Sequence, residues 1–137
     1  MEAVLPDLQA VILCEDVRAE LNGQHSIIGV IEVIPAPALP IGFFKLCLWT
    51  RWCGGMGSFN QRSVIQSSDD EGPIAEVSIS FQLKEMDSQA TNVHFFGGLQ
   101  FQKYGTYHVE IYLEEELRMR FPLSVVRVPM PPSGIGS

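Results

Sequence analysis

The chain has 137 residues, 46% of them hydrophobic and 18% charged, and its formal net charge is −7. This length suits one domain with a substantial core, and a composition so apolar and so poor in charge excludes an intrinsically disordered chain. The acidic balance argues against a nucleic-acid partner, because such proteins need basic surface to neutralise phosphates.

The sequence shows no segment that would cross a membrane. Charged residues interrupt every apolar stretch before it reaches the roughly 18 residues of a transmembrane helix. The apolar run near the N-terminus ends at Glu15 and Asp16 and lacks the basic start of a signal peptide. We therefore expect a cytoplasmic protein with no membrane partner, in which Cys14, Cys47 and Cys53 remain reduced thiols.

Hydrophobic alternation with a period of two dominates the chain and predicts strands rather than helices. It is clearest between residues 75 and 83, where apolar residues alternate with Glu, Ser and Gln. The predicted strands, in chain order, span residues 9–14, 25–34, 43–53, 62–67, 75–83, 92–101, 107–113 and 117–125.

Turn signals separate these strands. Asn22-Gly23 predicts a two-residue hairpin turn, because both positions tolerate a positive φ. Such a turn would place Glu20 opposite His25. The prolines between residues 35 and 40 predict an extended crossover outside any sheet, and the glycines of residues 54–58 predict a flexible loop.

Short strands with frequent turns indicate an antiparallel β-sandwich of about seven or eight strands, immunoglobulin-like or C2-like. A closed β-barrel is the alternative, because the number of strands does not separate the two folds. We expect a single sandwich domain over residues 1–128. A flexible tail rich in proline and glycine would follow it over residues 129–137.

Matching of the core faces in the C-terminal hairpin predicts a three-residue loop, Glu114 to Glu116. With that loop, Glu110 lies opposite Arg120 on the outer face. Three apolar pairs would then face the core, namely Leu113 with Leu117, Ile111 with Met119 and Val109 with Phe121. A glutamate of the loop that has a positive φ should be stabilised by replacement with glycine.

The segment 43–53 is the most informative part of the sequence. Alternation places one set of side chains toward the core, namely Phe44, Leu46, Leu48, Thr50 and Trp52. The opposite face receives Phe43, Lys45, Cys47, Trp49, Arg51 and Cys53. A tryptophan beside an arginine is typical of interface hot spots, so Lys45, Trp49 and Arg51 form a candidate interaction surface. In the alternative interpretation, Arg51 stacks over Trp49 and only shields the sheet.

None of the common catalytic or phosphate-binding motifs occurs in the sequence, so we expect a protein that is not an enzyme and holds no cofactor and no metal. Cys47 and Cys53 lack the spacing of a zinc site. Glu15 and Asp16 would point to opposite faces of a strand, so they do not form the carboxylate pair of a hydrolase. The acidic loop Asp69-Asp70-Glu71 leaves metal binding open, although it lacks the ligand spacing of a calcium loop.

Several segments together resemble a family of small uncharacterised bacterial proteins, a domain of unknown function. They are residues 12–20, Asn22-Gly23, Ile28-Gly29-Val30, Leu39-Pro40, Lys45-Leu46-Cys47 and a final strand pair near residues 105–126. The resemblance implies an all-β sandwich and no known activity, ligand or catalytic residue. The glutamates at the last turn depart from the glycine or aspartate expected there.

Two functions remain open from the sequence. The first is a non-enzymatic module that binds an unknown protein or a second copy of itself, through the surface of Lys45, Trp49 and Arg51. The alternative is a module that binds a small ligand or carbohydrate, with Trp49 or Trp52 as a stacking platform.

Overall fold

A computed structural model describes residues 3–69 and 71–130 of the chain. Within this part the chain forms nine strands and no helix, so no helix is present that could span a membrane. The strands are β1 (Asp7–Ala19), β2 (His25–Val30), β3 (Val33–Ala36), β4 (Ile41–Cys53), β5 (Gly57–Gln66), β6 (Pro73–Leu83), β7 (Gln89–Phe101), β8 (Gly105–Leu113) and β9 (Glu116–Arg127). Most of the predicted tail, residues 131–137, lies outside the described residues.

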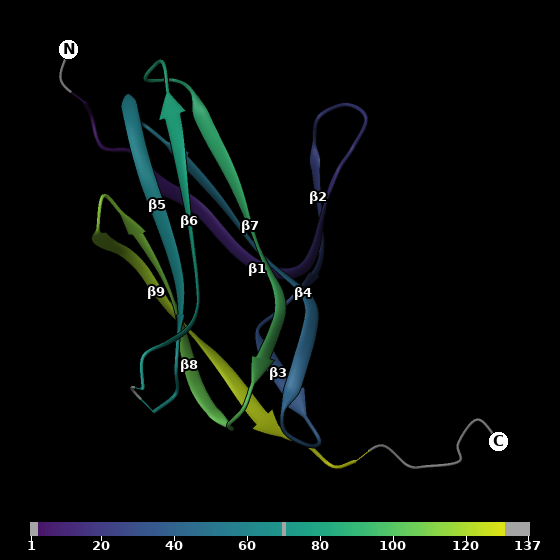
Figure 1. Cartoon of the computed structure of the whole chain (residues 1–137). Helices are drawn as coiled ribbons and strands as arrows, with labels where there is room; N and C mark the ends of the chain where they lie inside the picture. The colour runs from purple at the N-terminus through teal and green to yellow at the C-terminus, as the bar shows by residue number, and fades with distance from the viewer. Residues whose placement is uncertain (1–2, 70, 131–137) are drawn as a thin grey trace.

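The strands form two packed sheets, which confirms the predicted sandwich (Figure 1). Sheet one has the order β2-β1-β4-β7, and sheet two has the order β3-β9-β8-β5-β6. All neighbours are antiparallel except β3 and β9, which run parallel. The chain passes between the sheets through short connections, as expected of a sandwich in which most sequential strands pair.

Several strands are longer than predicted, β1 and β7 among them, and three further differences have a clear structural reason. The predicted strand 25–34 is divided into β2 and β3, which belong to different sheets. Pro35 lies within β3 rather than in a crossover. A proline is tolerated there because β3 is an edge strand, which forms hydrogen bonds with a neighbour on one side only and does not need every backbone N–H. β5 begins at Gly57, inside the predicted loop, because Val4 pairs with Met56 and holds that segment beside the N-terminus.

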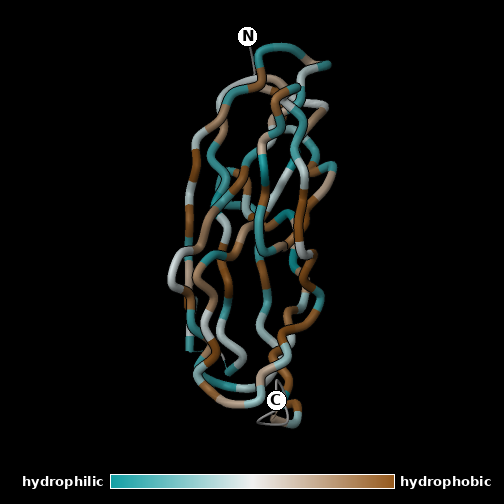
Figure 2. The backbone as a smooth tube through the Cα atoms, turned by 90° about the vertical axis from the view of Figure 1, so that its right-hand side faces the viewer, coloured by the Kyte–Doolittle hydropathy of each residue, from teal (hydrophilic) through white to brown (hydrophobic). Residues whose placement is uncertain are grey.

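The core fills the space between the two sheets with alternating side chains from both. Figure 2 shows hydrophobic and hydrophilic residues alternating along the strands. The alternation predicted for residues 75–83 and 107–113 is present in β6 and β8. One polar cluster is enclosed in this core: the amide oxygen of Gln61 accepts hydrogen bonds from Thr50, Trp52 and Asn92. Its members link the two sheets.

Phe44 does not face the core as predicted; its side chain is 96% exposed. Near Phe44, the core-facing positions of β4 and of its neighbour β7 both switch between even-numbered and odd-numbered residues. On β7, Phe96 and Leu99 are both buried although they are three residues apart, and Gly98 between them has a φ of 64°. Phe43 packs against the core in place of Phe44, with its ring 6.1 Å from that of Phe101.

The C-terminal hairpin has the predicted register in its body and a different turn. Glu110 pairs with Arg120 and the two charges are 3.3 Å apart. The loop contains two residues, Glu114 and Glu115, both with positive φ, and Leu113 lies opposite Glu116. The predicted three-residue loop is therefore wrong.

A β-bulge at Arg118 restores the register of this hairpin. It turns Leu117 outward, beside Tyr112, and leaves Leu117 49% exposed. Met119 is 38% exposed, because β3 covers β9 only from Ser124 onward. The prediction that these two side chains lie in the core is therefore wrong.

Candidate functional site

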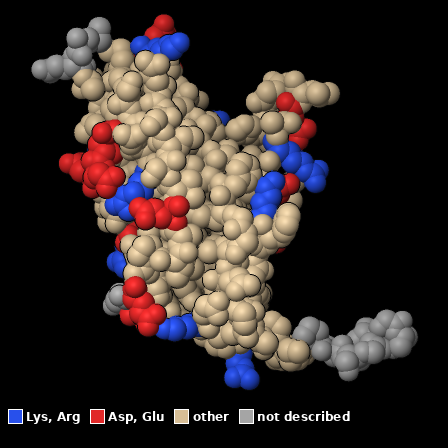
Figure 3. All heavy atoms as spheres, viewed as in Figure 1, with Lys and Arg blue, Asp and Glu red and all other residues tan. Residues whose placement is uncertain are grey.

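A hairpin arm, residues 15–30, stands away from the sandwich. β1 pairs with β4 only as far as Cys14, and beyond that residue it pairs with β2 alone. The end of β1 and all of β2 therefore form a two-stranded ribbon beside the outer face of sheet one (Figure 1). Figure 3 shows the arm as a projection separated from the body by a notch.

The turn of the arm differs from the predicted one. Ala19, and not Glu20, lies opposite His25, and the backbone N–H of Glu20 donates to the carbonyl oxygen of Gln24 instead. The loop therefore has three residues and ends in Gly23, whose φ of 86° suits glycine. The predicted pairing of Glu20 with His25 is wrong for this reason.

A hydrogen bond ties the arm to the sheet. The indole Nε1–H of Trp49, on the outer face of β4, donates to Nδ1 of His25 on β2 over 3.0 Å. Since Nδ1 is the acceptor, the neutral imidazole carries its proton on Nε2. His25 is exposed, whereas Trp49 is only 7% exposed. The ring of Trp49 is thus enclosed by the arm and by its neighbours on the sheet.

A cleft lies between the arm and the outer face of sheet one. Its volume is about 810 Å³, within the range of sites that take drug-sized ligands. Arm residues form one wall, and residues of β4 and β7 form the floor; the lining residues are Gly23, Gln24, His25, Ile27, Trp49, Arg51, Gln89 and Thr91. The cleft is therefore lined by aromatic, amide and cationic groups, and by no carboxylate.

The floor of the cleft fixes a guanidinium group. Arg51 stacks on Trp49, with its central carbon 4.9 Å from the ring centroid. Its Nε donates to the hydroxyl of Thr91 on β7 over 3.1 Å. A stacked and hydrogen-bonded guanidinium has little rotational freedom left, so its remaining N–H groups have a defined direction.

Lys45 lies outside the cleft, toward the base of the arm. Its ammonium is 2.7 Å from a carboxylate oxygen of Asp16, where β1 passes into the arm, and it also lies over the ring of Phe95. The hydrogen bond from Lys45 lowers the pKa of Asp16. Of the three residues predicted to form one surface, the structure places Trp49 and Arg51 in the cleft and Lys45 at the arm's base.

Trp52 points away from the cleft. Its side chain is 0% exposed, stacks on Phe81 and donates to Gln61 across the core. No ring face of Trp52 is open to a ligand. A ligand-binding role of the two tryptophans therefore depends on Trp49 alone.

The three cysteines, Cys14, Cys47 and Cys53, form no disulfide in the structure. Cys14 and Cys47 lie opposite each other on β1 and β4 and are both fully buried. Burial raises the pKa of the Cys14 thiol to about 11, with the neighbouring Cys47 thiol as a smaller cause. A thiol with so high a pKa is a poor nucleophile at neutral pH.

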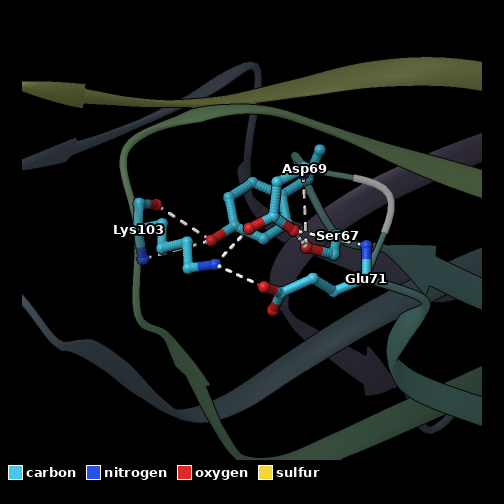
Figure 4. Close-up of polar contacts among 5 residues, drawn as sticks. Ser67, Asp69, Glu71 and Lys103 are labelled. Carbon is cyan, nitrogen blue, oxygen red and sulfur yellow. Dashed lines mark hydrogen bonds and ion pairs between the residues drawn. The ribbon is translucent and has the colours of Figure 1, made fainter.

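The acidic loop that left metal binding open already surrounds a cation of the chain itself. Lys103, in the connection from β7 to β8, pairs with Asp69 and with Glu71, and Ser67 donates to Asp69 (Figure 4). The hydrogen bond from Lys103 lowers the pKa of Asp69 to about 2. Asp70 lies outside the described residues. Among those that are described, no cluster of three metal-ligating side chains occurs.

Sequence reasoning identified the floor of the cleft and missed its wall. Trp49 and Arg51 stood out because an aromatic and a cation share a strand face. His25, Gln89 and Thr91 come from other strands, and no local pattern connects them to β4. In this region only Asn22-Gly23 indicated a structure, namely a hairpin, and they did not indicate that the hairpin lies beside the outer face of sheet one.

A comparison with protein-family models identifies one matching family. The model described as a family of unknown function, DUF6941, matches residues 9–126, which include the whole arm, all of β5 and β8, and β9 except for its last residue. No curated protein matches the sequence. The chain therefore belongs to the DUF6941 family of unknown function.

Proposed function

We propose that this protein is a non-enzymatic protein-interaction module, and that the cleft beneath the arm receives a segment of its partner. The observation that carries the proposal is the arm itself. Residues 15–30 leave the sheet and enclose a cleft instead of lying flat on the edge of the sandwich. An isolated two-stranded ribbon is only marginally stable, so its position depends on contacts such as the bond between Trp49 and His25.

The chemistry of the lining supports binding. Tryptophan and arginine are the residue types most enriched in interface hot spots, and both form the floor. Around them lie Ile27 and the polar side chains of Gln24, His25, Gln89 and Thr91, and these polar groups suit hydrogen bonds to a peptide backbone. Neither a thiol nor a carboxylate lines the cleft, so a nucleophile of either kind would have to come from elsewhere.

Site-specific photo-crosslinking in the cells that make the protein tests this proposal. A photoreactive amino acid replaces Gln89 in the cleft, and in a matched variant it replaces Gln102, an exposed glutamine in the connection after β7. We expect a discrete partner crosslinked from position 89 and absent from position 102. A crosslink to the chain's own copy identifies self-association. The same products from both positions, or none from position 89, would refute the proposal.

A further inference from the structure

Arg51 differs from the other cations of the chain. All nine lysines and arginines lie in the described part, and six of them form ion pairs, namely Arg18, Lys45, Arg62, Lys103, Arg118 and Arg120. Lys84 and Arg127 form no ion pair with the part of the chain that the structure describes, but both are exposed to water. Arg51 is half-buried and has no carboxylate partner among the described residues, in a chain whose net charge is −7.

The guanidinium of Arg51 retains most of its hydrogen-bonding capacity. Nε donates to Thr91, and the two terminal nitrogens have no partner among the described residues. These nitrogens carry four N–H groups in a planar fork, and a carboxylate can accept two of them in parallel. Stacking on Trp49 holds the plane of the fork in place before a ligand arrives.

The opposite wall supplies a second donor. Because Trp49 donates to Nδ1 of His25, the proton of the neutral imidazole is on Nε2, and the ring lines the cleft. No carboxylate among the lining residues would repel an anion or neutralise Arg51. The charge of the cleft is thus complementary to an acid, although the molecule as a whole is acidic.

We propose that the cleft binds an extended segment of the partner that presents an aspartate or glutamate carboxylate to Arg51. His25 contributes a second hydrogen bond, and the amides of Gln24 and Gln89 lie beside the backbone of the segment. A volume of about 810 Å³ exceeds the needs of one amino acid, which favours a peptide over a small free acid. This inference rests on the proposed function and specifies the chemistry of the partner.

Two pools of blocked hexapeptides test the inference by NMR. The pools differ only in Glu or Gln at the third position, and neither aspartate nor glutamate occurs elsewhere. The readout is the indole N–H signal of Trp49, with that of Trp52, enclosed in the core, as an internal control. We expect half-saturation by the Glu pool at a concentration at least about tenfold lower than by the Gln pool, because an ion pair is replaced by a neutral contact.

Two variants show whether Arg51 causes the preference for the Glu pool. Arg51→Gln should abolish the preference for the Glu pool. Arg127→Gln, which removes another unpaired cation on the exposed surface, should retain it. N-acetylglutamate amide alone should bind far more weakly than the Glu pool, and equal binding would overturn the peptide as the source of the carboxylate.

The outcomes separate this inference from the proposed function. Equal shifts of the Trp49 signal by both pools, or a preference that survives in Arg51→Gln, would overturn the carboxylate while leaving a peptide in the cleft. No shift by either pool would also overturn it, and the crosslinks from position 89 would then decide the proposed function by themselves.

Discussion

The two faces of β4 use similar residues for different purposes. Trp52 on the inner face and Trp49 on the outer face are 0% and 7% exposed, so burial hardly distinguishes them. Their hydrogen bonds distinguish the two tryptophans. Trp52 donates to Gln61 of the opposite sheet, whereas Trp49 donates to His25 on the arm. The first bond joins the two halves of the sandwich, and the second only positions a ribbon outside it.

The polar groups of the inner face are almost fully paired. Gln61 accepts three hydrogen bonds on its oxygen and donates to Ser63 through its nitrogen. Buried polar groups need such partners, because an unpaired one costs about 1–3 kcal/mol. The outer face leaves the terminal nitrogens of Arg51 without a partner. Hydrogen-bonding capacity that a ligand could reach, rather than exposure alone, is the feature on which the proposed role of the cleft depends.

The outer face of sheet two offers a second contrast. Arg62 lies over the ring of Tyr112 at 4.2 Å, much as Arg51 lies over Trp49. Arg62 also pairs with Glu76 and Glu115. The charge of the stacked arginine is therefore neutralised on the outer face of sheet two, whereas on the outer face of sheet one no described carboxylate pairs with it.

The largest expected effect separates the two tryptophans. Trp52→Ala should lower the free energy of unfolding by about 3–5 kcal/mol, because it removes a large aromatic side chain from the core. Trp49→Ala should cost less than about 2 kcal/mol, because the residues that enclose it belong partly to the arm. Urea unfolding measures both. Equal losses would mean that the arm is an integral part of the core and that the contrast between the faces is wrong.

His94 is the exception on the inner face and gives a prediction about pH. It is 2% exposed, both ring nitrogens lack a partner within residues 3–69 and 71–130, and burial lowers its pKa to about 4. The unfolded chain binds the proton at the ordinary pKa near 6.5, so the folded chain loses stability as the pH falls from about 6.5 to 4. The loss should be about 3 kcal/mol, from about 1.4 kcal/mol for each unit of pKa.

Urea unfolding at pH 7 and pH 4 checks this expectation against a His94→Leu variant. Leucine removes the titrating group and leaves no unpaired nitrogen in the core, so the variant should lose about 3 kcal/mol less than the wild type between these pH values. An identical loss in both proteins would show that His94 is protonated as easily in the folded as in the unfolded state.

The inner face was far easier to predict from the sequence than the cleft. Alternation located Leu46, Leu48 and Trp52 correctly, because one buried face imposes a strict period of two. It failed at Phe44, where the parity of two strands changes together at Gly98. A pattern within one strand has no information about such a change in its neighbour.

The arm was not predictable by the same reasoning. The predicted strand ended at residue 14, because Glu15 and Asp16 interrupt its apolar run, whereas β1 continues to Ala19 without β4 alongside. The bond between Trp49 and His25 joins residues 24 positions apart in the sequence. Contacts of this kind depend on where a strand bends, which hydrophobic periodicity does not report.

The two stacked arginines should respond differently to substitution. Arg62→Gln removes two ion pairs as well as the contact with Tyr112 and should cost about 1.5 kcal/mol, since each partly exposed pair contributes about 0.2–1 kcal/mol and the cation–π contact about 0.5 kcal/mol. Arg51→Gln removes none of the ion pairs found among the described residues and should cost about 1 kcal/mol, because it loses the half-buried cation–π contact with Trp49 and the hydrogen bond to Thr91. The difference should shrink in 1 M salt, which screens the pairs of Arg62. Equal costs that do not respond to salt would show that the ion pairs of Arg62 contribute nothing.

The smallest expected effect concerns the turns that close the arm and the C-terminal hairpin. The arm has glycine at its position of positive φ, whereas the other turn has Glu114 and Glu115 at φ values of 50° and 67°. Glu115→Gly should stabilise the protein by a few tenths to about 1 kcal/mol, because glycine adopts this conformation without strain. The lost ion pair with Arg62 offsets part of the gain, so the full gain should be visible in an Arg62→Gln background. Glu116→Gly is the matched control: Glu116 lies in β9 without a positive φ, and glycine there should destabilise the strand. If both glycine variants change the urea midpoint in the same direction, the left-handed turn at Glu114 and Glu115 is wrong.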